Sequence, residues 1–215
     1  PYMWFKHTNG TLGAVRAIAL DRPLLGFFYL LPMSLLGESP LVWQIFAILC
    51  RWIFTLSVFR FLMDIFPKNR GANKLIVLIF AVFLGFTQQY IAVIDSHAFL
   101  IFALYFFSLH LFIRAVVQER FSWLGLISIL IALICMAATE YLVGLEVLRP
   151  LIIFLMISRK NQALTFKQKA LKTLQIWLPY LAAGLGFVFY RTFLASSVLY
   201  KVQQVDNFFL SPLST

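Results

Sequence analysis

Long apolar runs separated by short polar breaks dominate this 215-residue chain. The fuller runs approach the roughly 20 residues that an α-helix needs to cross the hydrocarbon core of a bilayer. They occupy residues 41–66, 74–94, 98–117, 121–139, 141–158 and 176–194. An earlier run, 23–36, is too short to span and contains Pro32. The pattern predicts an all-α polytopic membrane protein with about six transmembrane helices and a short re-entrant or interfacial helix on the outer side.

The polar ends of the chain divide it into three parts. We expect an outer extramembrane segment at residues 1–22 and a transmembrane helical domain at residues 23–194. A second outer segment is expected at residues 195–215. The chain begins at Pro1 and ends on a polar stretch at Thr215. We therefore expect a fragment of a longer protein, with at least one helix before it and a C-terminal part after it.

Two helix boundaries stay open in this pattern. The polar stretch 87–90 could end the third segment near Phe86. The break at 139–140 is short for a hairpin, so Gly144 could carry the turn instead. In that case Arg149-Pro150 would open the next helix, because proline suits the first helical turn.

Composition narrows the class further. Apolar residues make up 62% of the chain, charged residues only 12%, and the mean hydropathy is +0.89. Soluble domains carry roughly 25% charged residues, so a soluble domain is excluded. The net charge of +10 comes from cations beside apolar runs, which predicts contact with membrane lipid and no binding of nucleic acid. Cys50 and Cys135 lie inside apolar runs, so we expect both to be small buried residues. Two such cysteines offer neither a disulfide framework nor a metal site.

The charges alternate between successive breaks. Lys and Arg gather at 67–74, 114–120 and 159–175, whereas the breaks at 95–97 and 139–140 contain none. By the positive-inside rule the basic breaks face the cytoplasm and the acidic ones face outward. Five of the eight acidic residues fall on the outer side: Asp21, Glu38, Asp95, Glu140 and Asp206. The basic stretch 159–175 also predicts a surface helix held by anionic lipid.

Some charges fall inside the apolar runs, where each costs about 2.5–3.5 kcal/mol on insertion scales. Arg51 lies near the middle of its run and needs an anion. That anion could be Glu146 from a neighbouring helix or the phosphate of a lipid ligand. Glu146 could equally pair with Arg149, which follows at i+3.

Three further ionisable residues have local interpretations. Arg60 and Asp64 are one helical turn apart, which predicts a local ion pair. His110 lies among Phe and Leu residues, which is typical of a core histidine.

The strongest candidates for chemistry lie at the outer breaks. Asp95 and His97 point the same way only in extended backbone, where they could share a proton or a hard metal; the alternative is a solvated loop. Asp21-Arg22 precedes the short outer helix, so the Asp21 carboxylate could be a helix cap or a catalytic group beside a phosphate-binding cation.

These outer motifs resemble polytopic glycosyltransferases of the GT-C superfold, in particular the protein-mannosyltransferase-like branch. Asp21 in Leu20-Asp21-Arg22-Pro23-Leu24 matches an Asp that precedes a short outer helix there, if one helix lies upstream. The stretches 85–97 and 139–150 resemble segments of bacterial membrane proteins grouped with that branch. The resemblance covers most of the chain in layout, through short motifs.

The resemblance implies an inverting hexosyltransferase of the bacterial plasma membrane, with a polyprenyl-phosphate sugar as donor. Asp21 would be the general base, with Asp95 and Glu140 as further catalytic candidates that orient sugar hydroxyls. Residues implied in binding the substrate and its phosphate are Arg22, Gln88, Gln89, His97, Arg149 and Arg191. No cofactor is required, although a divalent metal could take part.

Two other classes of function fit the same charges. A transporter or flippase for a lipid-linked or amphipathic substrate would use Arg51 and the outer acids to bind without turnover. A non-catalytic membrane subunit would use them to lock helices together. The sugar, the acceptor and the oligomeric state do not follow from the sequence.

Overall fold

Every element in the described part of the chain is a helix. The computed structural model describes residues 10–16, 19, 22–82, 92–117 and 123–191, without a strand among them. After a first helical stretch at 10–16, the elements are α2 (Pro23–Leu35), α3 (Pro40–Ile65), α4 (Arg70–Val82), α5 (Ala92–Val117), α6 (Trp123–Ala138), η2 (Glu140–Val147), α7 (Leu148–Lys160) and α8 (Phe166–Phe189). The predicted all-α class is therefore confirmed, and η2 is a 3₁₀-helix.

Among the described residues, three helical segments are long and apolar enough to cross a membrane: Pro40–Ile65, Ala92–Val117 and Glu140–Lys160, the last formed by η2 and α7 in succession. They are compatible with an integral membrane protein. The expected count of six is not reached within the described ranges. The apolar helix α6 has only 16 residues, α4 has 13, and three lysines occupy the first turns of α8.

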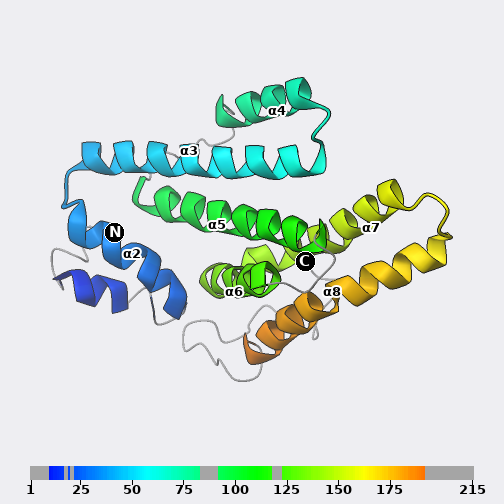
Figure 1. Cartoon of the computed structure of the whole chain (residues 1–215). Coiled ribbons are helices and arrows are strands. Elements are labelled where there is room, and N and C mark those ends of the chain that lie inside the picture. The colour runs from blue at the N-terminus through cyan, green and yellow to red at the C-terminus, as the bar shows by residue number, and fades with distance from the viewer. Residues whose placement is uncertain (1–9, 17–18, 20–21, 83–91, 118–122, 192–215) are drawn as a thin grey trace, which may run out of the picture.

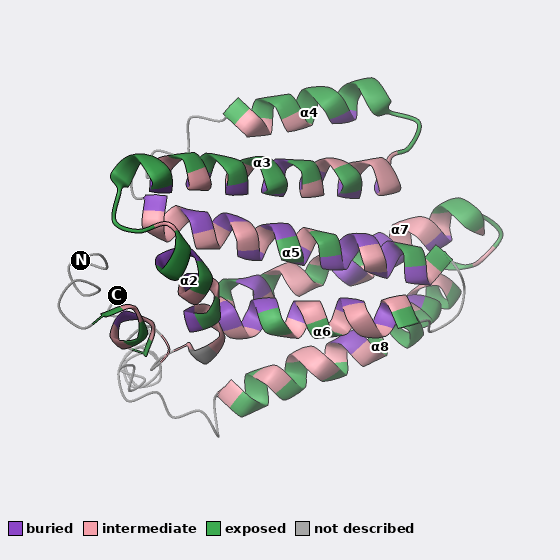
Figure 2. Ribbon diagram, turned by 60° about the vertical axis from the view of Figure 1, so that its left-hand side comes forward, coloured by how far each residue is buried: buried purple, intermediate pink, exposed green. Residues whose placement is uncertain are grey.

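Helix α5 forms the centre of the bundle (Figure 1). It packs most extensively against α3 on one side and α6 on the other, while α7 pairs with α8. Helix α4 lies on the far side of α3 from α5, and α3 is its main contact (Figure 1). The beginnings of α3 and α5 lie at the same end of the bundle in both ribbon views (Figures 1 and 2).

Local sequence explains where the α3–α4 hairpin begins and turns. Gly37 has a φ of 64° between α2 and α3, a conformation that glycine adopts without strain. Pro40 then occupies the first turn of α3, where its missing N–H group is not needed. At the other end, the buried Asn73 side chain donates to the carbonyls of Phe66 (2.8 Å) and Leu62 (3.3 Å). These carbonyls also accept the backbone N–H groups of Asn69 and Phe66, so the amide of Asn73 is a second donor that ties the start of α4 to the end of α3.

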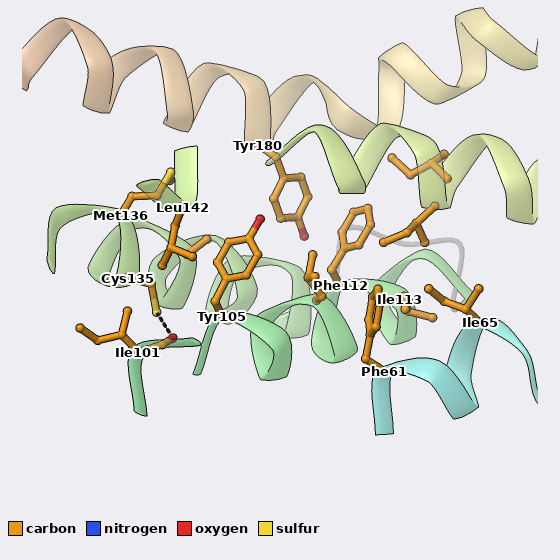
Figure 3. Packing of buried hydrophobic residues seen from close by; sticks show 14 of the residues in the cluster. Phe61, Ile65, Ile101, Tyr105, Phe112, Ile113, Cys135, Met136, Leu142 and Tyr180 are labelled. Atoms are coloured by element: carbon orange, nitrogen blue, oxygen red, sulfur yellow. Dashed lines mark hydrogen bonds between the residues drawn. The ribbon is translucent and has the colours of Figure 1, made fainter. Parts of the chain in front are cut away.

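The main hydrophobic core lies between the end of α3, α5, α6, η2, α7 and α8 (Figure 3). Buried residues concentrate on α5 and α6, whereas α4 and the outer face of α3 are largely exposed (Figure 2). Cys50 and Cys135 are both free and buried, as predicted, and the Cys135 thiol donates to the carbonyl of Ile101 (Figure 3).

Two predicted boundaries move. The break at 95–97 belongs to α5, which already begins at Ala92, since an acidic residue such as Asp95 is favourable in a first helical turn. The predicted surface helix at 159–175 and the predicted span at 176–194 meet in one helix, α8. It begins at a capping box in which Thr165 and Gln168 bind each other's backbone N–H groups. The interpretation with Arg149-Pro150 opening a helix agrees with α7, which begins at Leu148.

Candidate functional site

The predicted outer residues meet at one end of the bundle, which we call the Glu140 end. The Glu140 carboxylate accepts a hydrogen bond from Nε of Arg191 at 2.6 Å. Its second oxygen lies 3.9 Å from a terminal nitrogen of Arg22. Arg22 also lies over the ring of Tyr141, 5.9 Å from its centroid. We call Arg22, Glu140, Tyr141 and Arg191 the Glu140 cluster.

Each member of this cluster stands at a helix boundary. Glu140 is the first residue of η2, directly after the extended Thr139, and Arg22 is the N-cap residue of α2. Arg191 follows the end of α8. The side chains are partly open, with exposed fractions of 25% for Arg22, 39% for Glu140 and 23% for Arg191. Three segments remote in sequence thus place two cations and one carboxylate where a ligand can reach them.

His97 extends this polar region toward α2. Its Nε2 lies 3.3 Å from the hydroxyl of Tyr29, and its Nδ1 lies 3.4 Å from the carbonyl oxygen of Val93. Because that carbonyl can only accept, Nδ1 carries the proton in the neutral ring, and Nε2 accepts from the tyrosine hydroxyl. The charge of Arg22 also acts on His97, so the histidine lies within electrostatic reach of the Glu140 cluster.

The extended backbone in which Asp95 and His97 could share a proton or a metal is not found at these residues, and neither is the alternative, a solvated loop. Both residues lie in the first turns of α5, where positions i and i+2 project to opposite sides of the helix. Asp95 is half-buried and makes no hydrogen bond or ion pair with another residue that the structure describes. Within the same residues, no three His, Cys, Asp or Glu side chains form a group that could hold a metal.

Arg149 has a different environment from the one expected of a substrate ligand. Its side chain is 0% exposed, and its Nε donates to Glu146 at 2.8 Å. Its two terminal nitrogens donate to the hydroxyls of Ser128 (3.1 Å) and Ser108 (2.6 Å). We call these four residues the Arg149 cluster. The predicted pair of Glu146 and Arg149 is confirmed, but the geometry leaves Arg149 no access to a phosphate at the Glu140 end.

Aromatic rings complete the enclosure of Arg149. The rings of Tyr180, Phe112 and Tyr105 lie 4.6, 5.0 and 5.9 Å from its guanidinium carbon. Figure 3 shows these three rings converging from α5 and α8. The Tyr105 hydroxyl also donates to Glu146 at 3.1 Å. A buried cation with this many partners stabilises the packing of α5, α6, α7 and α8.

The structure does not bring Arg51 to Glu146. The partners of Glu146 are Tyr105 and Arg149, whereas Arg51 lines a pocket between α3 and α4 that also contains Lys74.

Asp64 also has a partner other than the expected Arg60. It forms a short contact with Nδ1 of His110 on α5, 46 positions away, and this contact satisfies the core histidine. No local spacing signals such a pair. Ser108 and Ser128, each hydrogen-bonded to the other's backbone carbonyl, were likewise missed. The only sequence signal for them is a polar residue inside an apolar run.

Three candidates, Asp21, Gln88 and Gln89, lie outside the described residues. The described neighbour of Asp21 is Arg22, which belongs to the Glu140 cluster.

No family model matches the chain, no curated protein matches it, and no solved structure matches it. The fold and the site alone define its class. In the part that the structure describes, the chain is all-helical, with three segments compatible with membrane insertion and a charged cluster at one end of the bundle.

Proposed function

We propose that this chain is the membrane-embedded part of a glycosyltransferase that moves a sugar from a polyprenyl phosphate to an acceptor hydroxyl. The supporting observation is that Arg22 and Arg191 converge on Glu140. Arg22 directly follows Asp21 in the sequence. Such a cluster offers cations that can bind a phosphate, close to carboxylates that can accept the proton of a hydroxyl nucleophile. In this proposal the Glu140 end faces outward from a bacterial plasma membrane and the basic breaks face the cytoplasm.

The two arginines would hold the phosphate of the donor. A guanidinium carries five N–H donors in a planar fork, so it can bind a carboxylate and a phosphate oxygen together. The carboxylate of Glu140 orients Arg191 through the 2.6 Å bond and approaches Arg22 at 3.9 Å. We therefore assign Glu140 as a positioning residue for the phosphate site.

The transfer itself needs one base and one stabilised leaving group. The Asp21 carboxylate takes the proton of the acceptor hydroxyl while that oxygen forms a bond to the anomeric carbon. The bond from that carbon to the phosphate oxygen breaks, and the polyprenyl phosphate leaves with its negative charge held by Arg22 and Arg191. A single displacement inverts the anomeric centre. Asp95, whose carboxylate is not committed to a described partner, is assigned to orient a sugar hydroxyl.

Asp21→Asn tests the proposal in membranes that contain the chain and radiolabelled polyprenyl-phosphate hexoses. We expect transfer to fall by about 10²- to 10⁴-fold when the base is lost. Arg22→Gln and Arg191→Gln are expected to lower transfer by about 10- to 100-fold, the value of a charge-assisted hydrogen bond. Glu38→Gln is the matched control, since Glu38 is exposed and lies in the α2–α3 turn.

The outcomes separate three classes of protein. Loss of transfer in Asp21→Asn, with unchanged thermal unfolding and full activity in Glu38→Gln, supports the enzyme. Retained binding of the donor without any transfer in the unmodified chain supports a transporter or flippase instead. Neither binding nor transfer, with all variants equally stable, supports a scaffold subunit and overturns the proposal.

A further inference from the structure

A surface that is both basic and apolar lies at the start of α8. The helix has 24 residues, so this surface is about 36 Å along the helix from its other end, where Arg191 joins the Glu140 cluster. The surface combines three lysines with three exposed apolar side chains: Phe166, Lys167, Lys169, Leu171, Lys172 and Leu174. We call it the α8 basic surface.

The charge of the α8 basic surface has one sign. The chain contains no Asp or Glu between residues 147 and 205. The helices that pack most against α8 are α7 and α6, and neither contains an acidic residue. Within the residues that the structure describes, the side chains of Lys167, Lys169 and Lys172 form no ion pair. The described part of the chain therefore supplies no counter-ion for this surface.

The position of these cations does not stabilise the helix itself. Lys167 and Lys169 lie within the first four residues of α8, directly after the Thr165 cap. The positive end of a helix dipole is its N-terminus, where cations are unfavourable and anions are favourable. The lysines and the dipole therefore attract the same kind of partner, a negatively charged surface outside the helix.

Exposed apolar side chains accompany the cations. Phe166, Leu171 and Leu174 are 73%, 58% and 47% exposed. Lys167, Leu171 and Leu174 follow one another at intervals of four and three residues, so they form one stripe along the helix. Thr173, in contrast, is buried against the bundle. A stripe that begins with a cation and continues with leucines matches a lipid surface, where anionic headgroups lie directly above hydrocarbon.

The neighbouring helix places the α8 basic surface at a membrane boundary. The candidate span Glu140–Lys160 ends at the last residue of α7, and α8 begins shortly afterwards. The rings of Phe154 and Phe166 are in edge contact, with centroids 5.5 Å apart, which holds the start of α8 beside the last turns of α7. In both ribbon views the α7–α8 turn lies at the same end of the bundle as the basic α3–α4 turn (Figures 1 and 2). In the predicted orientation this end meets the cytoplasmic leaflet.

We propose that the α8 basic surface binds anionic phospholipid headgroups of the cytoplasmic leaflet. The three lysines lie at the phosphates, and Leu171 and Leu174 lie among the adjoining parts of the acyl chains. Because the basic stretch and the apolar stretch after it form one continuous helix, this contact also sets the depth at which α8 enters the membrane. The binding is independent of the proposed transfer reaction.

The test uses the purified full chain in phosphatidylcholine vesicles, with a fluorescent probe on Gln175→Cys. Gln175 is exposed one turn after Leu171, and Cys50 and Cys135 are buried, so the probe labels one position. Trace phosphatidylglycerol or phosphatidylcholine, each with the same nitroxide-labelled acyl chain, quenches the probe when it lies nearby. One basic residue near a lipid surface corresponds to about fivefold enrichment of anionic lipid, so phosphatidylglycerol should quench about five times more strongly.

Loss of the three lysines should remove this preference. In Lys167→Gln with Lys169→Gln and Lys172→Gln, the two lipids should quench equally, whereas replacement of the same lysines by arginine should retain the preference. The glutamine variant should remain folded, because it removes cations from the positive end of the helix dipole. The matched control removes the same charge from three exposed cations of the α3–α4 turn and should retain the preference: Lys68→Gln, Arg70→Gln and Lys74→Gln.

Three results would overturn the proposal. Equal quenching by the two lipids in the chain with all its lysines would show lipid contact without selection by charge. Absence of quenching by either lipid would show that the start of α8 lies away from lipid, as expected if an acidic protein covers it. Equal loss of the preference in the two triple glutamine variants would show a diffuse charge effect and no binding at this surface.

Discussion

Arg149→Met is the substitution with the sharpest expected effect on stability. It removes a cation whose side chain is 0% exposed and leaves Glu146 in place, 12% exposed. The hydroxyls of Ser108 and Ser128 lose their shared donor at the same time. Methionine fills much of the space between the aromatic rings, so the loss is mainly electrostatic and not a cavity.

The magnitude follows from breaking one buried ion pair. Removal of one partner typically costs about 3–5 kcal/mol, because the other charge stays buried without compensation. For a chain of 150–250 residues, each kcal/mol lowers the unfolding temperature by roughly 2–4 °C. The expected decrease is therefore about 6–20 °C. If Glu146→Gln is added to Arg149→Met, the orphaned charge disappears, and we expect most of this decrease to be recovered.

Thermal unfolding of the purified chain in detergent, followed by circular dichroism, measures both variants. Arg114→Met is the matched control, since Arg114 is exposed on α5 and its loss should change stability by less than about 0.5 kcal/mol. A decrease of less than 2 °C in the unfolding temperature of Arg149→Met would refute the argument that the Arg149 cluster stabilises the packing of the helices. A double variant less stable than either single variant would refute the argument that the uncompensated charge dominates.

Three further predictions address the hairpin, a helix cap and the topology. Asn73→Leu should cost about 1–3 kcal/mol through the loss of two side-chain hydrogen bonds that tie α4 to the carbonyls of Phe66 and Leu62, and hydrogen exchange at the start of α4 should accelerate while that of α6 does not change. Thr165→Ala should cost about 0.5–2 kcal/mol through loss of the capping box; Thr165→Ser should restore most of it, and an equal loss in both variants would contradict a capping role. A membrane-impermeant maleimide should label Glu38→Cys from outside intact cells and Lys68→Cys only after permeabilisation; the natural cysteines, both buried, should stay unlabelled. Labelling of the two positions from the same side would contradict the predicted orientation.

The helices could be predicted from the sequence because apolar runs and helix-start residues are local signals. The run 41–66 became α3 within one residue at each end, with Pro40 in its first turn. The prediction failed where polarity was taken as a sign of a loop. Asp95 and His97 are polar, but the first two turns of α5 tolerate both: Asp95 benefits from the helix dipole, and His97 binds Val93 and Tyr29.

The site could be predicted only in part. The pair of Glu146 and Arg149 follows from i, i+3 spacing. Glu140 was identified as an outer acidic residue, and Arg22 and Arg191 were named as the phosphate-binding residues that the family resemblance implies. The contact of Glu140 with Arg22 and Arg191 could not be derived, because it depends on how the beginnings of α2 and η2 lie against the end of α8. The same reason applies to Asp64 and His110, whose helices α3 and α5 meet through packing alone.

The 3₁₀ winding of η2 has a mechanical consequence for the two charged clusters. Its eight residues join Glu140, held by two surface arginines, to Arg149, held in the core. At about 2.0 Å per residue this segment is about 16 Å long, against about 12 Å as an α-helix. Rewinding it would retract Glu140 by about 4 Å and rotate it by nearly half a turn, since a 3₁₀-helix has about 3.0 residues per turn and an α-helix about 3.6. With the Arg149 end held in the core, any rewinding of η2 would therefore shift the Glu140 carboxylate along the helix axis and rotate it about that axis at the same time.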